Sequence, residues 1–156
     1  MARHTALVSW SSDGDFRSGR YSRRHSWRFD GGAVVTASSS PDVVPLPMSD
    51  AAGVDPEEAL IAAVASCHML WFLDLARRAG LAVASYSDEA EGQMGRIGPE
   101  RLAITRITLR PEIAFDGSPP AADQLARLHE EAHERCFIAN SLRSEIVVEA
   151  KAPASR

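Results

Sequence analysis

The chain has 156 residues, of which 45% are hydrophobic and 24% charged, the balance of a folded protein rather than of a disordered or fibrous one. A net charge of −4 and an aromatic content of 6% argue against binding to nucleic acid. No apolar run reaches the ~20 residues of a membrane span, and the N-terminus lacks the features of a signal peptide. We therefore expect a cytoplasmic protein that forms one domain over residues 1–156.

The first third of the chain carries strand signals. Residues 4–10 predict a first strand, and residues 16–29 alternate aromatic and polar side chains with period two, as a half-buried strand does. A turn at Gly31-Gly32 leads to a short strand over residues 33–37. The proline-containing residues 38–54 are expected to form a loop.

A long helix is predicted to begin after Asp55 and to stop at Gly80. Asp55 can cap the helix, and Glu58 completes a capping box and adds negative charge at the positive end of the helix dipole. The apolar stripe of this helix consists of Leu60, Val64, Cys67, Trp71 and Leu75. Cys67 is therefore expected to face the core or a partner, with its apolar neighbours as core or pocket wall.

Two strands, residues 81–94 and 101–115, are predicted next, with a bulge near Thr105-Arg106 where the alternation slips by one residue. A second helix opens at Pro119-Pro120, and a last strand covers residues 145–150. The stripe of the second helix consists of Leu125, Leu128, Ala132 and Cys136. Strands separated by two unequal helices predict an α+β protein with helices packed on an antiparallel or mixed sheet.

The two cysteines, Cys67 and Cys136, each lie on the apolar stripe of a helix. In a reducing compartment such a pair is seldom a structural disulfide, which leaves inert core residues, metal ligands or reactive thiols. In a reactive pair, one thiolate attacks an oxidant and the other thiol closes a disulfide. The attacking thiol then needs a positive group nearby to lower its pKa.

The residues around the cysteines form three segments: Asp55-Pro56-Glu57-Glu58-Ala59-Leu60, Ala65-Ser66-Cys67-His68-Met69-Leu70 and Ala132-His133-Glu134-Arg135-Cys136. Their combination resembles the OsmC/Ohr family of osmotically inducible and organic-hydroperoxide-resistance proteins. The resemblance implies an OsmC-like fold, in which sheets pack on a long central helix and a second helix. It also implies an intertwined homodimer whose active sites are shared between the chains.

The same resemblance implies a thiol peroxidase that reduces organic hydroperoxides with no metal, haem or other cofactor. Cys67 would be the peroxidatic nucleophile, Cys136 would resolve its sulfenic acid as a disulfide, and Glu57 would hold an arginine that stabilises the Cys67 thiolate. An external dithiol, such as a lipoyl group, would reduce the disulfide. Phe137 stands where the family usually has a proline after the resolving cysteine.

Among the early arginines, Arg17 matches the spacing of the family pattern. Arg17 and Arg23 also share the odd-numbered, aromatic face of the strand predicted over residues 16–29, so Arg17 is our first choice for the thiolate-stabilising residue and Arg23 our second. Glu57 and Cys67 are separated by ten residues, or ~15 Å of helix. A site that uses both needs a fold-back or a second chain, and we expect an obligate dimer.

A competing motif lies on the second helix, where His129-Glu130-Glu131-Ala132-His133 fits the His-Glu-x-x-His pattern of zinc hydrolases. Cys136 could supply a third ligand, although no third-ligand motif follows in this short chain. A zinc hydrolase is therefore one alternative, and a non-catalytic binding module is another. His68 lies about 100° around the helix from Cys67 and is expected to pack rather than to act as a base.

Overall fold

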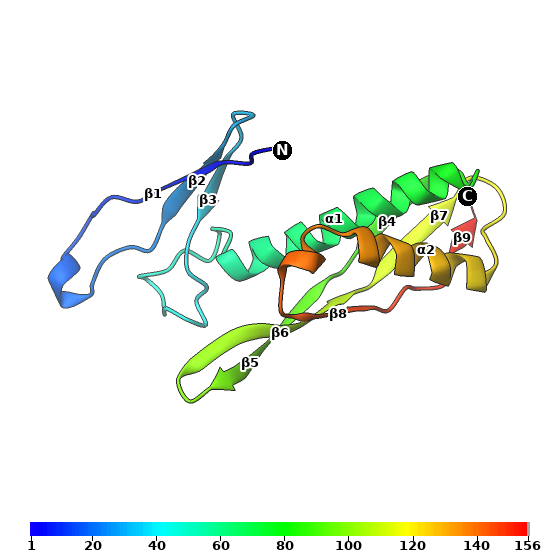
Figure 1. Ribbon diagram of the computed structural model, residues 1–156. Coiled ribbons are helices and arrows are strands. Elements are labelled where there is room, and N and C mark those ends of the chain that lie inside the picture. Colours follow the sequence, from blue (N-terminus) through cyan, green and yellow to red (C-terminus); the bar gives the residue numbers. More distant parts are fainter. Residues whose placement is uncertain (156) are drawn as a thin grey trace. The chain divides into compact units, whose positions relative to one another are not determined.

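The structure is a computed structural model that describes residues 1–155. It divides into an N-terminal unit, residues 1–59, and a C-terminal unit that begins at Leu60. The N-terminal unit contains the antiparallel sheet β1–β2–β3 (Figure 1). Its elements are β1 (Ala6–Ser9), the 3-10 helix η1 (Phe16–Ser18), β2 (His25–Phe29) and β3 (Val34–Ala37).

The strand predicted over residues 16–29 is wrong in its first half, because only His25–Phe29 is a strand. The Asp15 carboxylate accepts a hydrogen bond from the Ser18 backbone N–H at 3.3 Å, which closes the single turn η1. Gly19 then leaves the turn in the left-handed conformation, with φ of 80°. The period-two pattern therefore does not continue through Arg17. The other strands predicted in this unit are confirmed with shorter bounds.

Helix α1 runs from Pro56 to Arg78, close to its predicted length. The capping box is confirmed, since the Glu58 N–H donates to Asp55 Oδ1 at 2.7 Å and the Asp55 N–H donates to Glu58 Oε2 at 3.1 Å. At the other end Gly80 has φ of 75°, a conformation that glycine adopts without strain. Local sequence chemistry thus fixes both ends of the helix.

The buried face of α1 is rotated relative to the predicted stripe. Its buried side chains are Val64, His68, Phe72, Leu75 and Ala76. Cys67 and Trp71 are half-buried at the edge of that face. By length and composition α1 could also cross a membrane, which the sequence analysis did not expect, but its buried side chains pack in the core of the C-terminal unit.

The C-terminal unit contains two mixed three-stranded sheets. One has the order β4–β7–β9, formed by Val83–Asp88, Pro111–Phe115 and Ala154–Ser155. The other has the order β5–β6–β8, formed by Glu91–Gly98, Arg101–Leu109 and Glu145–Val148. In each sheet the first pair is antiparallel and the second parallel. The α+β class with mixed sheets is confirmed, while the short strand β9 was not predicted.

Each of the two long predicted strands is divided between the two sheets. The first strand is divided after Asp88 and the second at Arg110. These two points lie side by side, because the Arg110 backbone N–H donates to Asp88 Oδ1 at 2.6 Å. The predicted bulge is confirmed, because Gln93 pairs with Arg106 and Met94 with Ile104, which leaves Thr105 as the extra residue.

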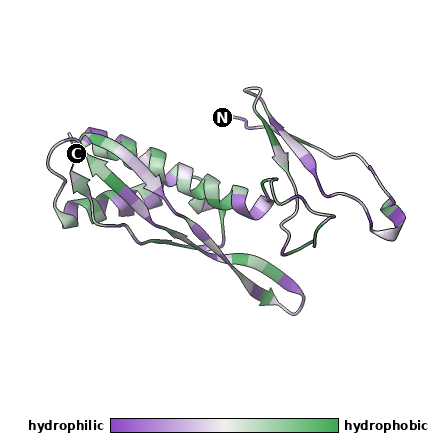
Figure 2. Cartoon of the chain, turned by 180° about the vertical axis from the view of Figure 1, so that it is seen from behind, coloured by the Kyte–Doolittle hydropathy of each residue, from purple (hydrophilic) through white to green (hydrophobic). Residues whose placement is uncertain are grey.

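Helix α2 (Ala122–Arg135) lies antiparallel to α1 in the C-terminal unit and is followed by the 3-10 helix η2 (Ala139–Ser141) (Figure 1). Its predicted stripe is confirmed, with His129 as an additional buried residue. The larger core cluster, between these helices and strands β4 and β7, consists of Phe72, Leu75, Ala76, Ile113, Phe115, Leu125, Leu128 and Ala132. Figure 2 shows the hydrophobic stretches that recur along α1 and the adjoining strands.

Candidate active site

The two cysteines are neighbours in the C-terminal unit, close enough for the Cys67 thiol to act on the pKa of Cys136, and both are free thiols. Cys67 is half-buried in the middle of α1, whereas Cys136 is fully buried at the C-terminal cap of α2. Burial, together with the contact of the Cys67 thiol, raises the pKa of Cys136 to about 11 against a hydrogen bond from the Ala139 N–H to its Sγ at 3.4 Å. The pair therefore combines an accessible thiol with a buried one that stays protonated at neutral pH.

A cavity of about 510 Å³ opens in front of Cys67. Its walls are Ala63, Ser66, Cys67, Leu70, Trp71, Asp74, Phe137 and Ile138. The Trp71 and Phe137 rings meet edge to face with centroids 5.6 Å apart, which gives the cavity an aromatic wall. This arrangement suits an apolar small molecule, and it places the Phe137 ring in the wall of the cavity that Cys67 lines.

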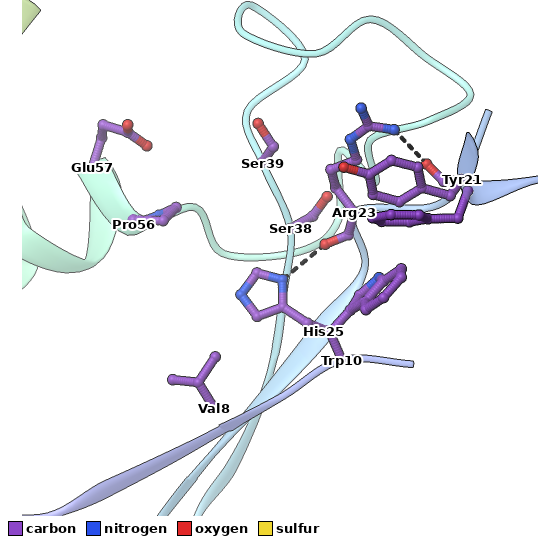
Figure 3. Close-up of a pocket in the computed structure, with 10 residues that line it drawn as sticks. Val8, Trp10, Tyr21, Arg23, His25, Ser38, Ser39, Pro56 and Glu57 are labelled. Atoms are coloured by element: carbon purple, nitrogen blue, oxygen red, sulfur yellow. Dashed lines mark hydrogen bonds between the residues drawn. The ribbon is translucent and has the colours of Figure 1, made fainter. Parts of the chain in front are cut away.

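A second cavity, of about 440 Å³, lies within the N-terminal unit and contains Arg23 and Glu57 (Figure 3). The Arg23 guanidinium donates to the backbone oxygens of Tyr21 at 2.6 Å and Gly19 at 3.0 Å, and it lies 3.7 Å from the centre of the Tyr21 ring. Glu57 is half-buried in the first turn of α1. Among residues 1–155 neither charge has an ion-pair partner within 4.0 Å.

Arg17 lies elsewhere, as an exposed residue of η1 that does not line this cavity. Arg17 was predicted to lie on the inward face of a continuous strand, but η1 and Gly19 interrupt that strand. The structure thus brings Arg23, rather than Arg17, into one cavity with Glu57. Because α1 is unbroken between Glu57 and Cys67, the ~15 Å of helix that separates them remains.

His68 is buried, as expected for a packing residue, but it has a partner that the sequence analysis missed. Its Nε2 lies 3.0 Å from Nδ1 of His129, so the first histidine of the zinc motif already uses one ring nitrogen inside the core. Within residues 1–155 no group of three or more His, Cys, Asp or Glu side chains is placed to hold a metal ion. The zinc interpretation therefore has no ligand set in the described part of the chain. The apolar stripe predicted for the long helix does not include His68, so the sequence pattern did not point to this contact.

Comparisons with known proteins agree with this fold. The family model for OsmC-like proteins matches residues 49–151. An OsmC-like protein of unknown function from Vibrio cholerae is 46% identical, with a TM-score of 0.94 over 97% of this chain and 100% of the other. An OsmC-like protein from Mycoplasma pneumoniae is 15% identical, with a TM-score of 0.74 over 98% of both chains.

An organic hydroperoxide resistance protein from Legionella pneumophila is 14% identical, with a TM-score of 0.65 over 100% of this chain and 98% of the other. At such low identity the likeness shows the fold alone. No curated protein matches the chain. The family model, which covers more than half of the sequence, and the Vibrio relative together show that the chain belongs to the OsmC-like family.

Proposed function

We propose that the chain is a cytoplasmic cysteine-based peroxidase that reduces organic hydroperoxides, with Cys67 as the peroxidatic thiol and Cys136 as the resolving thiol. The observation that carries the proposal is the proximity of the two thiols, close enough for Cys67 to act on the pKa of Cys136, beside an apolar cavity of about 510 Å³. The half-buried Cys67 thiol can meet a substrate from solvent, whereas the fully buried Cys136 thiol cannot. Proteins of this fold that are described as organic hydroperoxide resistance proteins add support.

In the first step, the thiolate of Cys67 attacks the terminal oxygen of the hydroperoxide. The O–O bond breaks, the alkoxide leaves as an alcohol after taking up a proton, and Cys67 becomes a sulfenic acid. The apolar walls of the cavity favour a hydroperoxide with an organic substituent over hydrogen peroxide, because burying that substituent adds binding energy. The Cys67 thiolate is itself the nucleophile and the two-electron reductant, so this step needs no bound cofactor.

In the second step, the sulfur of Cys136 attacks the sulfenic sulfur of Cys67. A disulfide forms, and the hydroxyl group leaves as water with the proton that the Cys136 thiol gives up. The high pKa of Cys136, about 11, keeps this thiol protonated until the sulfenic acid forms beside it. An external dithiol, such as a lipoyl group, then restores both thiols by exchange.

The first step needs a positive charge near Cys67, which we propose is supplied by Arg23 held with Glu57. Arg23 shares a cavity with Glu57 and is fixed by two backbone carbonyls, which favours it over the exposed Arg17. Because Glu57 lies ~15 Å from Cys67 along α1, the proposal includes a homodimer in which one chain's Arg23 and Glu57 serve its partner's cysteines.

The test is a count of free thiols with Ellman's reagent before and after one equivalent of cumene hydroperoxide. We expect the wild type to lose both thiols. The Cys136→Ser variant should consume one equivalent and accumulate a sulfenic acid at Cys67 that dimedone traps.

Cys67→Ser is the matched control, since it retains the buried thiol and should not react. If both wild-type thiols survive stoichiometric hydroperoxide, the peroxidase proposal is wrong. An active monomer in sedimentation would contradict the shared site while leaving the dithiol chemistry in place.

A further inference from the structure

A pair of buried histidines joins α1, which carries Cys67, to α2, which ends at Cys136. His68 is 1% exposed and His129 is 5% exposed, and the His68 Nε2 and His129 Nδ1 atoms are 3.0 Å apart. The two rings are nearly parallel, with an angle of 7° between their planes. Phe72 stacks on His129 with ring centroids 4.5 Å apart, which places an apolar ring on one side of the pair.

Both imidazoles are neutral at physiological pH. The pKa of each ring is lowered to about 4, chiefly by burial, and for His68 the neighbouring His129 and His133 contribute to this shift. A neutral imidazole has one N–H donor and one bare nitrogen acceptor. One ring therefore donates and the other accepts in a single N–H···N bond, which has a preferred direction that apolar packing lacks.

The bond lies at a specific place relative to the dithiol. His68 follows Cys67 directly, and His129 precedes Cys136 by seven residues, or two turns of helix. A slip of α2 by one residue would rotate its side chains by about 100° and carry both His129 and Cys136 away from α1. The surroundings are apolar residues such as Leu128 and Ala132, which tolerate small sliding better than a hydrogen bond does.

We propose that the His68–His129 hydrogen bond is a positioning device that holds Cys136 against Cys67 and so favours their disulfide. The proposal rests on the proposed dithiol role of these cysteines. The bond fixes the rotation and register of α2 on α1, which raises the effective concentration of the Cys136 thiol at Cys67. Neither histidine touches the reacting sulfur atoms in this role.

The test is the equilibrium between dithiol and disulfide in graded glutathione buffers. In this reaction the two cysteine thiols are oxidised to one disulfide, while one oxidised glutathione is reduced to two thiols. We expect His129→Phe, which keeps the aromatic shape but removes the bond, to weaken the disulfide about tenfold. That change corresponds to a reduction potential about 30 mV less negative.

Two further variants separate positioning from general loosening of the core. His129→Asn places an amide where Nδ1 was, so it can restore the bond and should recover most of the shift. Leu128→Ala removes packing from the neighbouring buried position of α2 and should lower stability without moving the potential by more than about twofold in the equilibrium constant.

The two histidines should also act as one unit. His68→Phe should shift the equilibrium as much as His129→Phe, and the double variant should shift it no further, because all three lack the same bond. Equal shifts in His129→Phe and Leu128→Ala, or no shift in either, would overturn the proposal. A wild type that forms no Cys67–Cys136 disulfide in any buffer would contradict the proposed function itself, and the positioning role with it.

Discussion

The two units of the chain bury their hydrophobic side chains to very different extents. In the C-terminal unit, two clusters of apolar residues fill the space between the helices and the sheets. In the N-terminal unit, the buried residues are Ala37, Ser38 and Ser49. Large side chains that stay exposed there include Leu7, Val8, Trp10, Phe16, Phe29 and Val34.

This difference indicates where the stability of the fold resides. A three-stranded sheet gains independent stability only when one of its faces is packed, and the sheet β1–β2–β3 exposes much of its apolar surface within its own unit. The cavity with Arg23 and Glu57 thus belongs to a unit whose sheet needs a packing partner for its exposed apolar surface. In the proposed homodimer a second copy supplies that cover, which would couple folding of the N-terminal unit to assembly of the site.

The largest expected effect separates the cores of the two units. Phe72 is fully buried, and Phe72→Ala should lower the free energy of unfolding by about 3–5 kcal/mol at any protein concentration. Phe29→Ala, on the exposed sheet, should act through association, so its unfolding midpoint should fall further on dilution. Urea unfolding at several protein concentrations checks both. A Phe29→Ala effect that does not depend on concentration would argue against a cover from a second copy.

The next expected effect is a loss of stability of the C-terminal unit at acidic pH. The folded pKa values of His68 and His129 are about 4, below the ~6.5 of the unfolded chain, so the unfolded state binds more protons between these values. Their contribution to stability is present above pH ~6.5 and is lost as the pH falls toward 4. At pH 5 the loss should be about 2 kcal/mol for each imidazole.

Urea unfolding at pH 7.5 and pH 5 measures this loss. The His68→Phe/His129→Phe double variant is the matched control, because it retains two buried rings but has no imidazole to protonate. Its stability should change much less between the two pH values than that of the wild type. An equal acid sensitivity in both proteins would show that other groups carry it.

The sequence predicts the C-terminal unit better than the N-terminal one, for physical reasons. In the C-terminal unit, the stripe of α2 and the bulge at Thr105 depend on residues close in sequence. The same holds for the capping box of Asp55 and Glu58, at the end of the N-terminal unit. The rotated stripe of α1 could not be predicted, because an almost wholly apolar helix offers several faces of similar hydrophobicity. The prediction of a strand through Arg17 was wrong, because the turn η1 and the left-handed Gly19 interrupt the segment despite its alternating pattern.

In the candidate site, too, the features that the sequence pattern did not predict join residues far apart in the chain. Cys67 and Cys136 were predicted to be neighbours only through the family resemblance, and the helix pattern alone left inert core residues equally open. The His68–His129 contact joins residues 61 positions apart, and no local pattern encodes such a pairing. Arg23, which lines the cavity with Glu57, lies in an irregular segment, where the period of a strand does not predict which way a side chain points.

A smaller effect tests which arginine of the N-terminal unit matters. A thiol of ordinary pKa, ~8.5, is only a few per cent thiolate at pH 7, so loss of a thiolate-stabilising charge in Arg23→Met should slow the first reaction of Cys67 with cumene hydroperoxide by roughly ten- to thirtyfold at pH 7. Raising the pH should recover much of that rate, because at higher pH the Cys67 thiol loses its proton without a nearby positive charge. Stopped-flow rates from pH 6 to 9 give the profile.

Arg17→Met is the matched control, since it removes the same charge from an exposed turn. Its rate should stay within about twofold of the wild type. If Arg17→Met shows the large loss and Arg23→Met does not, the family spacing is a better guide to the arginine than the cavity is.

The smallest effect lies at the start of α1, where the chain passes from one unit to the other. Asp55→Ala removes the acceptor for the Glu58 N–H and should cost about 1 kcal/mol in urea unfolding, whereas Asp55→Ser keeps an acceptor and should cost less. The same first turn carries Glu57, so its fraying should also slow the peroxide reaction, by less than Arg23→Met does. A normal rate in a destabilised Asp55→Ala protein would mean that Glu57 does not need a fixed position, and the proposed hold of Glu57 on the arginine would then be wrong.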